Sequence, residues 1–362
     1  MRLCLNMIVR NEAAVIERCL ASVRDRIHAW AIVDTGSTDG TQDRIRAFLH
    51  DIPGTLAEHE WVDFATNRNQ ALVLARELGD YALFVDADDF LSFDEGFSFE
   101  GLTGPAYTVE TEVAGVVSMV ETLVRLDLDW KWQGVLHETL QAGEPVVWQA
   151  LSGVRLCKPG GGARGREGVR EKYARDARVL REALRHEPGN VRYRFYLAHS
   201  LRESGDYAAA LAAYADFIEA KTGSAEETYF ARLMLPLLGE RCGWDDERVL
   251  AAYRSAYEFR PQRAETMSRL ARYHLRRNRF AQARECARLA LATPPTTDTL
   301  LVDRGAWTWK PLDDMAGAAL GQGDVAAARE AYKRLLADVS APAAERERVR
   351  HHLERLERTP QT

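Results

Sequence analysis

The sequence predicts an α/β domain with a mostly parallel sheet, followed by an all-α domain of helical repeats. Two observations support this prediction. Short apolar segments alternate with amphipathic ones over the first hundred residues. After a glycine-rich stretch the chain is helical and repeats a pattern of small and aromatic residues. Alternating strands and helices are typical of parallel sheets, because a crossover helix returns the chain to the start of the next strand.

The elements of the predicted sheet follow from local patterns. Each expected strand is an apolar run that ends in polar turn residues, and each expected helix spaces its apolar residues three and four positions apart. The expected strands are 3–9, 30–33, 54–59 and 81–85, and the expected helices are 12–24, one from 41, and 66–78. After residue 100, segments 107–126 and 146–157 lack helical periodicity and predict a smaller, antiparallel region.

The second half repeats a spacing of small and aromatic residues that is similar to tetratricopeptide repeats. The segment Thr293–Pro311 interrupts the array, and its Trp307 and Trp309 are candidates for contact with the molecule that the repeats select. We expect domains at 1–158 and 170–362, with a glycine-rich linker at 159–169. The three copies are Ala198, Gly205, Tyr207, Ala210 and Tyr214; Ala271, Asn278, Phe280, Ala283 and Ala287; and Ala316, Gly323, Val325, Ala328 and Tyr332.

Composition narrows the class of protein. With 362 residues, 46 % of them hydrophobic and 28 % charged, the chain is typical of a globular protein with two cores. No apolar run approaches the length of a membrane span, and the first ten residues have too short an apolar core for a signal peptide. Five scattered cysteines predict a reducing, cytoplasmic location without disulfides. Residues 1–158 hold 13 Lys and Arg against 25 Asp and Glu, and the rest of the chain has a net positive charge. A basic second half suits an acidic or phosphorylated partner, but a solvated surface is the more usual reason for such an excess. Nucleic acid is not expected as a partner.

Three carboxylates, Asp86, Asp88 and Asp89, follow the apolar run 81–85. Strand alternation would place Asp86 and Asp88 on one side, about 7 Å apart. Like charges at that distance repel unless a cation lies between them or one carboxylate is protonated. Hard divalent cations bind one or two carboxylates and complete their shell with water and phosphate oxygens. The pattern therefore predicts a metal–diphosphate site at the end of a strand.

The segment Asp34–Thr41 lies where a strand passes into a helix. Its amides and carboxylates are suited to hold the polar edges of a nucleotide. An equally good interpretation is that Asp39 caps the helix and Gln42 completes a capping box.

Four motifs in order resemble family 2 glycosyltransferases of the GT-A fold, over residues 1 to about 155. They are Asn11-Glu12, the Asp34–Thr41 turn, Asn67-Arg68-Asn69 and the DxD pattern of Asp86-Ala87-Asp88. The resemblance implies a nucleotide-sugar donor, most simply a UDP-sugar, and a divalent Mn²⁺ or Mg²⁺. It places Glu12 and Asp39 at the base with Asp34 nearby, Asp86 toward the ribose, Asp88 on the metal, and Arg68 near the phosphates or sugar. The alternative for Arg68 is a structural ion pair, and Asp89 is expected only to cap its turn.

The segment Trp130–Glu138 supplies the second group of candidates. By the same resemblance His137 is the other metal ligand, although a single histidine is more often an ordinary polar residue. Trp132 is a candidate for stacking on the acceptor side, or for the core. Transfer with inversion needs a base for the acceptor's proton. Glu138 is the first candidate and Asp129 the second, because the commoner acidic pair after two glycines is absent.

The glycine-rich segment offers two interpretations. It either folds over the donor, with Arg164 and Arg166 countering the phosphate charge, or serves as an interdomain linker.

Together these patterns predict a metal-dependent glycosyltransferase whose helical repeats select the acceptor. The layout resembles bacterial peptide and protein glycosyltransferases, so we expect a peptide or protein side chain as acceptor. A natural product, a polysaccharide and modified nucleic acid remain alternatives, as does a scaffold with an inactive glycosyltransferase domain. A nucleotidyltransferase is disfavoured, because residues 3–15 lack a glycine-rich phosphate loop.

Overall fold

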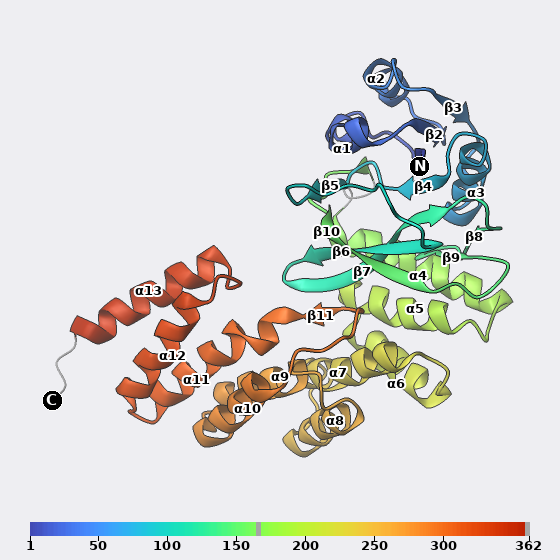
Figure 1. Cartoon of the computed structure of the whole chain (residues 1–362). Coiled ribbons are helices and arrows are strands. Elements are labelled where there is room, and N and C mark those ends of the chain that lie inside the picture. The colour runs from blue at the N-terminus through green and yellow to red at the C-terminus, as the bar shows by residue number, and fades with distance from the viewer. Residues whose placement is uncertain (164–167, 359–362) are drawn as a thin grey trace. The chain divides into compact units, whose positions relative to one another are not determined.

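The computed structural model describes residues 1–163 and 168–358, and it has the predicted fold class, a mostly parallel sheet followed by helical repeats (Figure 1). The chain divides into two compact units, Met1–Ala213 and a second that begins at Tyr214. Helices α4 (Val169–His186) and α5 (Val191–Ser204) therefore belong to the first unit. The domain limits expected from the sequence, 1–158 and 170–362, stay a prediction.

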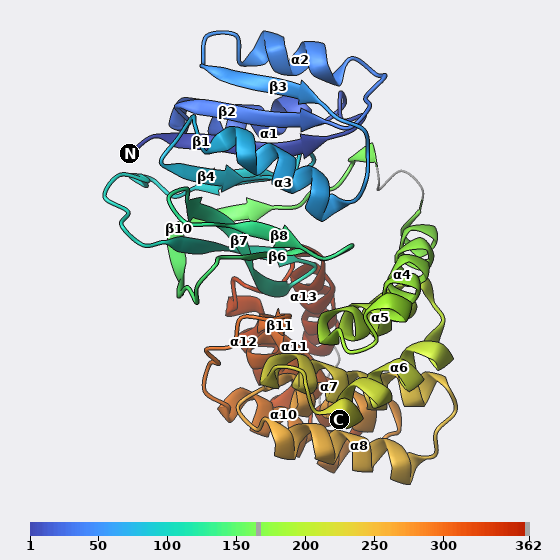
Figure 2. The ribbon, with the colours of Figure 1, turned by 90° about the vertical axis from the view of Figure 1, so that its right-hand side faces the viewer.

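The main sheet of the first unit joins a parallel group of strands to a mostly antiparallel one. The parallel strands lie in the order β3-β2-β1-β4, as Figure 2 shows, and the order continues with β7-β6-β10-β5. A separate hairpin pairs β8 with β9. The strands are β1 Leu3–Val9, β2 Ala29–Asp34, β3 Gly54–Glu58, β4 Tyr81–Phe84, β5 Phe90–Phe93, β6 Ala106–Val113, β7 Val116–Arg125, β8 Lys131–Gln133, β9 Thr139–Gln141 and β10 Trp148–Cys157.

Helices cover both faces of the parallel strands. Leu3 and Leu5 of β1 pack on one face against α1 (Ile16–Val23) and α2 (Thr41–Phe48). Cys4, which alternates with them, belongs to the opposite core with Leu72 of α3 (Phe64–Ala75), and Figure 1 shows α1 and α3 on opposite sides of the strands. A short 3₁₀ helix, Arg24–Arg26, follows α1.

The order of the strands determines the edge of the sheet at which a ligand is expected to bind. The chain runs outward from β1 to β2 and β3, and then returns to place β4 on the other side of β1. In open α/β sheets ligands bind outside the carboxyl ends of the strands where the order reverses. The loops after β1, β2 and β4 meet at that edge.

The repeated positions found in the sequence have the same structural role in each copy. Gly205, Asn278 and Gly323 have positive φ values of 91°, 56° and 77° and make the turn between paired helices. The alanine five residues after each turn residue, such as Ala210 and Ala283, is fully buried. The helices are α6 Tyr207–Ala220, α7 Ala225–Arg241, α8 Asp246–Phe259, α9 Glu265–Arg276, α10 Phe280–Ala292, α11 Trp309–Gly321, α12 Val325–Ala337 and α13 Ala343–Arg358.

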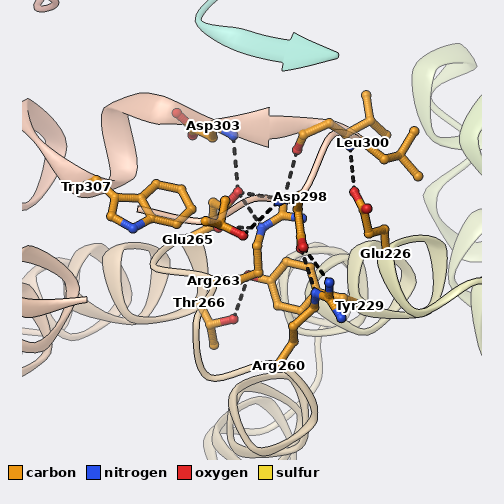
Figure 3. A network of polar contacts seen from close by, with 12 residues as sticks. Glu226, Tyr229, Arg260, Arg263, Glu265, Thr266, Asp298, Leu300, Asp303 and Trp307 are labelled. Carbon is orange, nitrogen blue, oxygen red and sulfur yellow. Dashed lines mark hydrogen bonds and ion pairs between the residues drawn. The ribbon is translucent and has the colours of Figure 1, made fainter. Parts of the chain in front are cut away.

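A buried ionic network fastens the segment between α10 and α11 to the repeats (Figure 3). This segment contains β11 (Val302–Asp303) and a 3₁₀ helix, Arg304–Trp307. Arg263, only 1 % exposed, donates hydrogen bonds to Glu265 and to Asp298 of the segment. The interruption is thus a fixed part of the second unit. No helix in the described part of the chain is both long and apolar enough to cross a membrane.

Candidate active site

The loops after β1 and β2 form one cluster at the carboxyl edge of the sheet. The backbone N–H of Asn11 donates to Ser37 Oγ at 2.8 Å, and that of Thr38 donates to Asn11 Oδ1 at 2.8 Å. The N–H of Glu12 donates to Thr41 Oγ1 at 2.8 Å. Because β1 and β2 are parallel neighbours, the first two sequence motifs become a single polar surface.

The two carboxylate oxygens of Asp34 have different surroundings. Its Oδ1 accepts hydrogen bonds from the N–H groups of Gly36 and Ser37 at 2.9 and 2.8 Å, and from Gln42 Nε2 at 3.0 Å. The residue is 0 % exposed, and no group in the described residues donates to Oδ2. A buried acceptor without a donor is costly, so a ligand that donates there would be favoured.

Asp34 lies in the wall of a pocket of about 370 Å³. Trp61, which follows β3, is 39 % exposed and forms another part of the wall. The pocket therefore offers a flat aromatic side chain beside a carboxylate. Its lining residues are Arg10, Asp34, Thr35, Gly36, Glu58, His59, Glu60 and Trp61.

The side chain of Asp39 connects the loop after β2 to the loop after β1 through hydrogen bonds. Its Oδ1 accepts from the backbone N–H and the hydroxyl of Thr41, and its Oδ2 accepts from the N–H of Ala13 at 3.0 Å. Partial burial opposes ionisation, but these hydrogen bonds outweigh it and lower the pKa of Asp39. Both oxygens of Asp39 are thus used within the loops.

The acidic cluster lies in a turn. β4 ends at Phe84, and the N–H of Asp89 donates to the carbonyl of Asp86 at 3.0 Å. The expectation that strand geometry places Asp86 and Asp88 on one side was therefore wrong in its premise, because the strand stops two residues before Asp86.

Arg68 connects this turn with the loop between β8 and β9. Asp63 caps the start of α3 and accepts from the N–H of Thr66, which places Arg68 in the second turn of the helix. Its Nη2 donates to Asp86 Oδ1 and its Nε to Glu138 Oε1, each at 2.7 Å. Burial disfavours the charged guanidinium, but the two carboxylates outweigh it and raise the pKa of Arg68.

The residues before the undescribed range 164–167 lie against the acidic turn. A Cβ added at Gly162 would lie 2.5 Å from Asp88 Oδ2, so this close approach requires glycine. The N–H of Ala163 donates to both carboxylate oxygens of Glu12 at 3.2 Å. Asp89 is buried against Lys158; burial raises the pKa of Asp89 to about 6 although Lys158 opposes this.

Comparison with known proteins identifies this part of the chain. Residues 4–96 match the model of Glycosyl transferase family 2. They form a family 2 glycosyltransferase domain.

Two curated relatives share parts of the sequence. A TPR repeat-containing protein of Synechococcus elongatus is 37 % identical over 143 residues, which cover 37 % of this chain and 34 % of that protein. The SPbeta prophage-derived glycosyltransferase SunS of Bacillus subtilis is 26 % identical over 209 residues, which cover 54 % of this chain and 48 % of that protein. The chain thus spans about a third to a half of the length of these relatives.

Among solved structures, S. aureus TarS 1–349 in complex with UDP-GlcNAc aligns at 15 % identity and a TM-score of 0.36, over 71 % of this chain and 91 % of that one.

Family 2 domains commonly use a divalent metal, and Asp88 and His137 are the residues expected to bind it. In residues 1–163 and 168–358 no three or more His, Cys, Asp or Glu side chains group to hold an ion. A carboxylate and an imidazole nevertheless suit an ion that takes its other ligands from diphosphate and water. Gly162 approaches the Asp88 carboxylate so closely that no side chain fits at that position. His137 stacks on Tyr196 with ring centroids 3.9 Å apart, which fixes the plane of its imidazole.

Several predicted residues lie apart from this cluster. Asp129 is 84 % exposed and pairs with Arg76, which lies eight residues after Arg68 and thus about 12 Å further along α3. Trp132 is buried, packed edge-on against Phe84, so its ring is part of the core beneath the family 2 domain's site.

The remaining candidates belong to other parts of the chain. In the second unit, Trp307 Nε1 donates to the carbonyl of Pro294 at 2.9 Å, and Lys310 lies over the ring of Trp309. Arg164 and Arg166 lie outside the residues that the structure describes.

The sequence patterns did not single out Trp61 or predict the close approach of Gly162 to Asp88. Trp61 lies three residues beyond the end of β3, at the same sheet edge as Asp34. The general preference of ligands for the carboxyl ends of parallel strands could have singled it out. No local pattern could have placed Gly162 beside Asp88, because their approach depends on the pairing of β10 with β5, in which Cys157 lies opposite Phe90.

Proposed function

We propose that this chain is a metal-dependent glycosyltransferase that transfers a sugar, with inversion, from a nucleoside diphosphate donor to a peptide or protein side chain. The observation that carries the proposal is the buried Asp34 Oδ2, an acceptor to which no described residue donates, on a residue that lines a pocket. The ring N–H of a base such as uracil is complementary to it, and Trp61 is suited to stack on the base. The family 2 match over residues 4–96 supports this assignment.

The residues around Arg68 fit the chemistry of transfer. Arg68 is a fixed positive charge between Asp86 and Glu138, near the proposed path of the departing diphosphate. Glu138, whose side chain is 9 % exposed, is the proposed base that accepts the proton of the attacking acceptor. A bound Mn²⁺ or Mg²⁺, held by Asp88 and His137, would neutralise charge on the leaving diphosphate.

The acceptor is assigned from the helical repeats. Repeat arrays of this kind present extended concave surfaces, which suit an extended polypeptide. The five scattered cysteines support a cytoplasmic location as part of the same proposal.

A thermal-shift screen of nucleotide sugars, with and without Mn²⁺, tests the proposal together with an assay of donor hydrolysis. We expect one class of donor to stabilise the protein more with Mn²⁺, and Asp88→Ala to remove that metal-dependent part. Asp94→Ala, an exposed carboxylate paired with Arg155, is the matched control. Neither turnover nor metal-dependent nucleotide binding in the unmodified protein would favour an inactive scaffold instead.

A further inference from the structure

The loop that carries His137 and Glu138 has a strained backbone. It joins β8 to β9, and two of its residues, Gly134 and His137, have positive φ values of 111° and 51°. A non-glycine residue in the left-handed region is strained by about 1–3 kcal/mol and persists where surrounding contacts fix it. The contacts that fix this loop come from two helices of the first unit.

Helix α3 holds the base of the hairpin. Asn69 Nδ2 donates to the carbonyl of Trp132 at 2.9 Å, and the N–H of Trp132 donates back to Asn69 Oδ1 at 2.8 Å. One residue earlier, Arg68 binds Glu138. The start of β8 and the proposed base are thus both attached to one turn of α3.

Helix α5 holds the tip of the loop at three points. Arg192 Nε donates to the carbonyl of His137 at 2.6 Å, and the hydroxyl of Tyr193 accepts from the N–H of Val135 at 3.1 Å. The ring of Tyr196 lies parallel to the His137 imidazole, with an angle of 6° between the planes. Between these contacts Leu136 packs into a small core with Tyr193.

We propose that α5 is a positioning element of the transfer reaction, which through Arg192, Tyr193 and Tyr196 keeps the Glu138 carboxylate on Arg68. This inference rests on the proposed function. It assigns to catalysis a helix that the sequence places in the acceptor-selecting repeats. The base pocket at Asp34 and Trp61 is built by other elements, so the loss of an α5 contact should slow transfer without weakening the binding of the nucleotide in the absence of metal.

The test compares kcat with the metal-free affinity for the nucleoside diphosphate in Tyr196→Ala and Tyr196→Phe. We expect Tyr196→Ala to lower kcat about tenfold to a hundredfold, because small displacements of reacting groups have effects of that size. The affinity for the nucleoside diphosphate, measured without metal, should stay within twofold because the base pocket is unchanged. Tyr196→Phe keeps the stacked ring and should restore the rate. Arg194→Ala is the matched control on the same helix, since its guanidinium binds the carbonyl of Pro188 instead.

Arg192→Met is a second variant, which removes the hydrogen bond to His137 and the guanidinium that lies over the Tyr196 ring. It provides the test if Tyr196→Ala does not fold. A kcat within twofold of the unmodified enzyme in these variants would overturn the positioning role and leave the proposed function standing. Equal impairment of Tyr196→Ala and Tyr196→Phe would also overturn it. No donor turnover by the unmodified protein would overturn both proposals.

Discussion

Arg68 Nε donates a hydrogen bond of 2.7 Å to Glu138 Oε1 across 70 residues of sequence. The same guanidinium binds Asp86 through Nη2. One side chain on α3 thereby joins the turn after β4 to the loop between β8 and β9. The proposed base is thus oriented by a fixed cation at the edge of the sheet.

Glu138→Gln should slow sugar transfer about 10²- to 10⁴-fold, because the amide cannot accept the acceptor's proton. Donor binding should persist, since the pocket around Asp34 is unchanged. Steady-state transfer and calorimetric nucleotide binding measure the two effects. Asp129→Asn is the matched carboxylate control and should leave the rate within twofold. If Asp129→Asn were slow and Glu138→Gln normal, Asp129 and not Glu138 would be the base.

Asp34→Asn should change which base the pocket accepts. Three donors, from Gly36, Ser37 and Gln42, hold Oδ1, so the asparagine carbonyl oxygen must occupy that place. Its amide N–H then replaces Oδ2 and points a donor where the base N–H needs an acceptor. We expect UDP binding to weaken about tenfold or more, which corresponds to roughly 1.4 kcal/mol, and CDP binding to suffer less. Isothermal calorimetry measures both, with Asp51→Asn as an exposed control; unchanged UDP affinity would remove Asp34 from the base site.

Gly162→Ala should raise the Mn²⁺ concentration needed for activity. The added Cβ would lie 2.5 Å from Asp88 Oδ2, so the carboxylate must move. Changes beside a metal ligand typically weaken metal binding about tenfold to a hundredfold. A Mn²⁺ titration of donor hydrolysis tests this. Gly189→Ala, where a Cβ meets open space, should match the unmodified enzyme, and an identical curve for Gly162→Ala would separate Asp88 from the metal.

Arg263→Ala should destabilise the second unit severely. It removes the guanidinium that pairs with the buried carboxylates of Glu265 and Asp298. Loss of one partner of a buried pair costs about 3–5 kcal/mol, because charge remains in a low-dielectric interior. Urea unfolding followed by circular dichroism measures the change. Arg288→Ala, in an exposed pair with Glu285, should leave the midpoint unchanged, and equal stability of the two variants would show that the network contributes little.

Asp314 should make stability depend on pH. Burial raises the pKa of Asp314 to about 7 from its ordinary 3.8, although Arg272 opposes the shift. The folded state thus binds this proton more tightly than the unfolded chain, and the resulting stability is complete below about pH 3.8 and lost as the pH rises through 7. Relative to Asp314→Asn, the unmodified protein should lose about 2 kcal/mol of unfolding free energy between pH 5.5 and 8.

Urea unfolding at the two pH values measures this difference. Asp43→Asn, whose side chain is 90 % exposed, serves as the control and should run parallel to the unmodified protein. Parallel behaviour of Asp314→Asn as well would mean that Asp314 keeps an ordinary pKa.

Much of the fold follows from local sequence. The apolar runs at β1, β2 and β4 predict their strands, and the pattern after 107 predicts the antiparallel pair β6 and β7. The small residues of the repeats, and the turns at Gly205 and Gly323, were found from spacing alone. Order of motifs was sufficient to predict the family 2 domain that the comparison with its family model supports.

Contacts between distant segments could not be obtained in that way. Asp129 and Glu138 are acidic residues of the same short segment, and their local sequence does not distinguish them. Packing does, because Asp129 is exposed beside Arg76, whereas Glu138 is largely buried against Arg68. The position of Asp88 in a turn depends on where β4 leaves the sheet.

The sequence by itself determined which chemical groups this protein has and in which order they follow the strands, because hydrophobic periodicity and turn residues act over a few positions. Only the tertiary structure decided how those groups are paired: which oxygen of Asp34 lacks a donor, which carboxylates share Arg68, and which helix holds His137. Those pairings depend on strand order and side-chain packing across many tens of residues, and no local pattern encodes them.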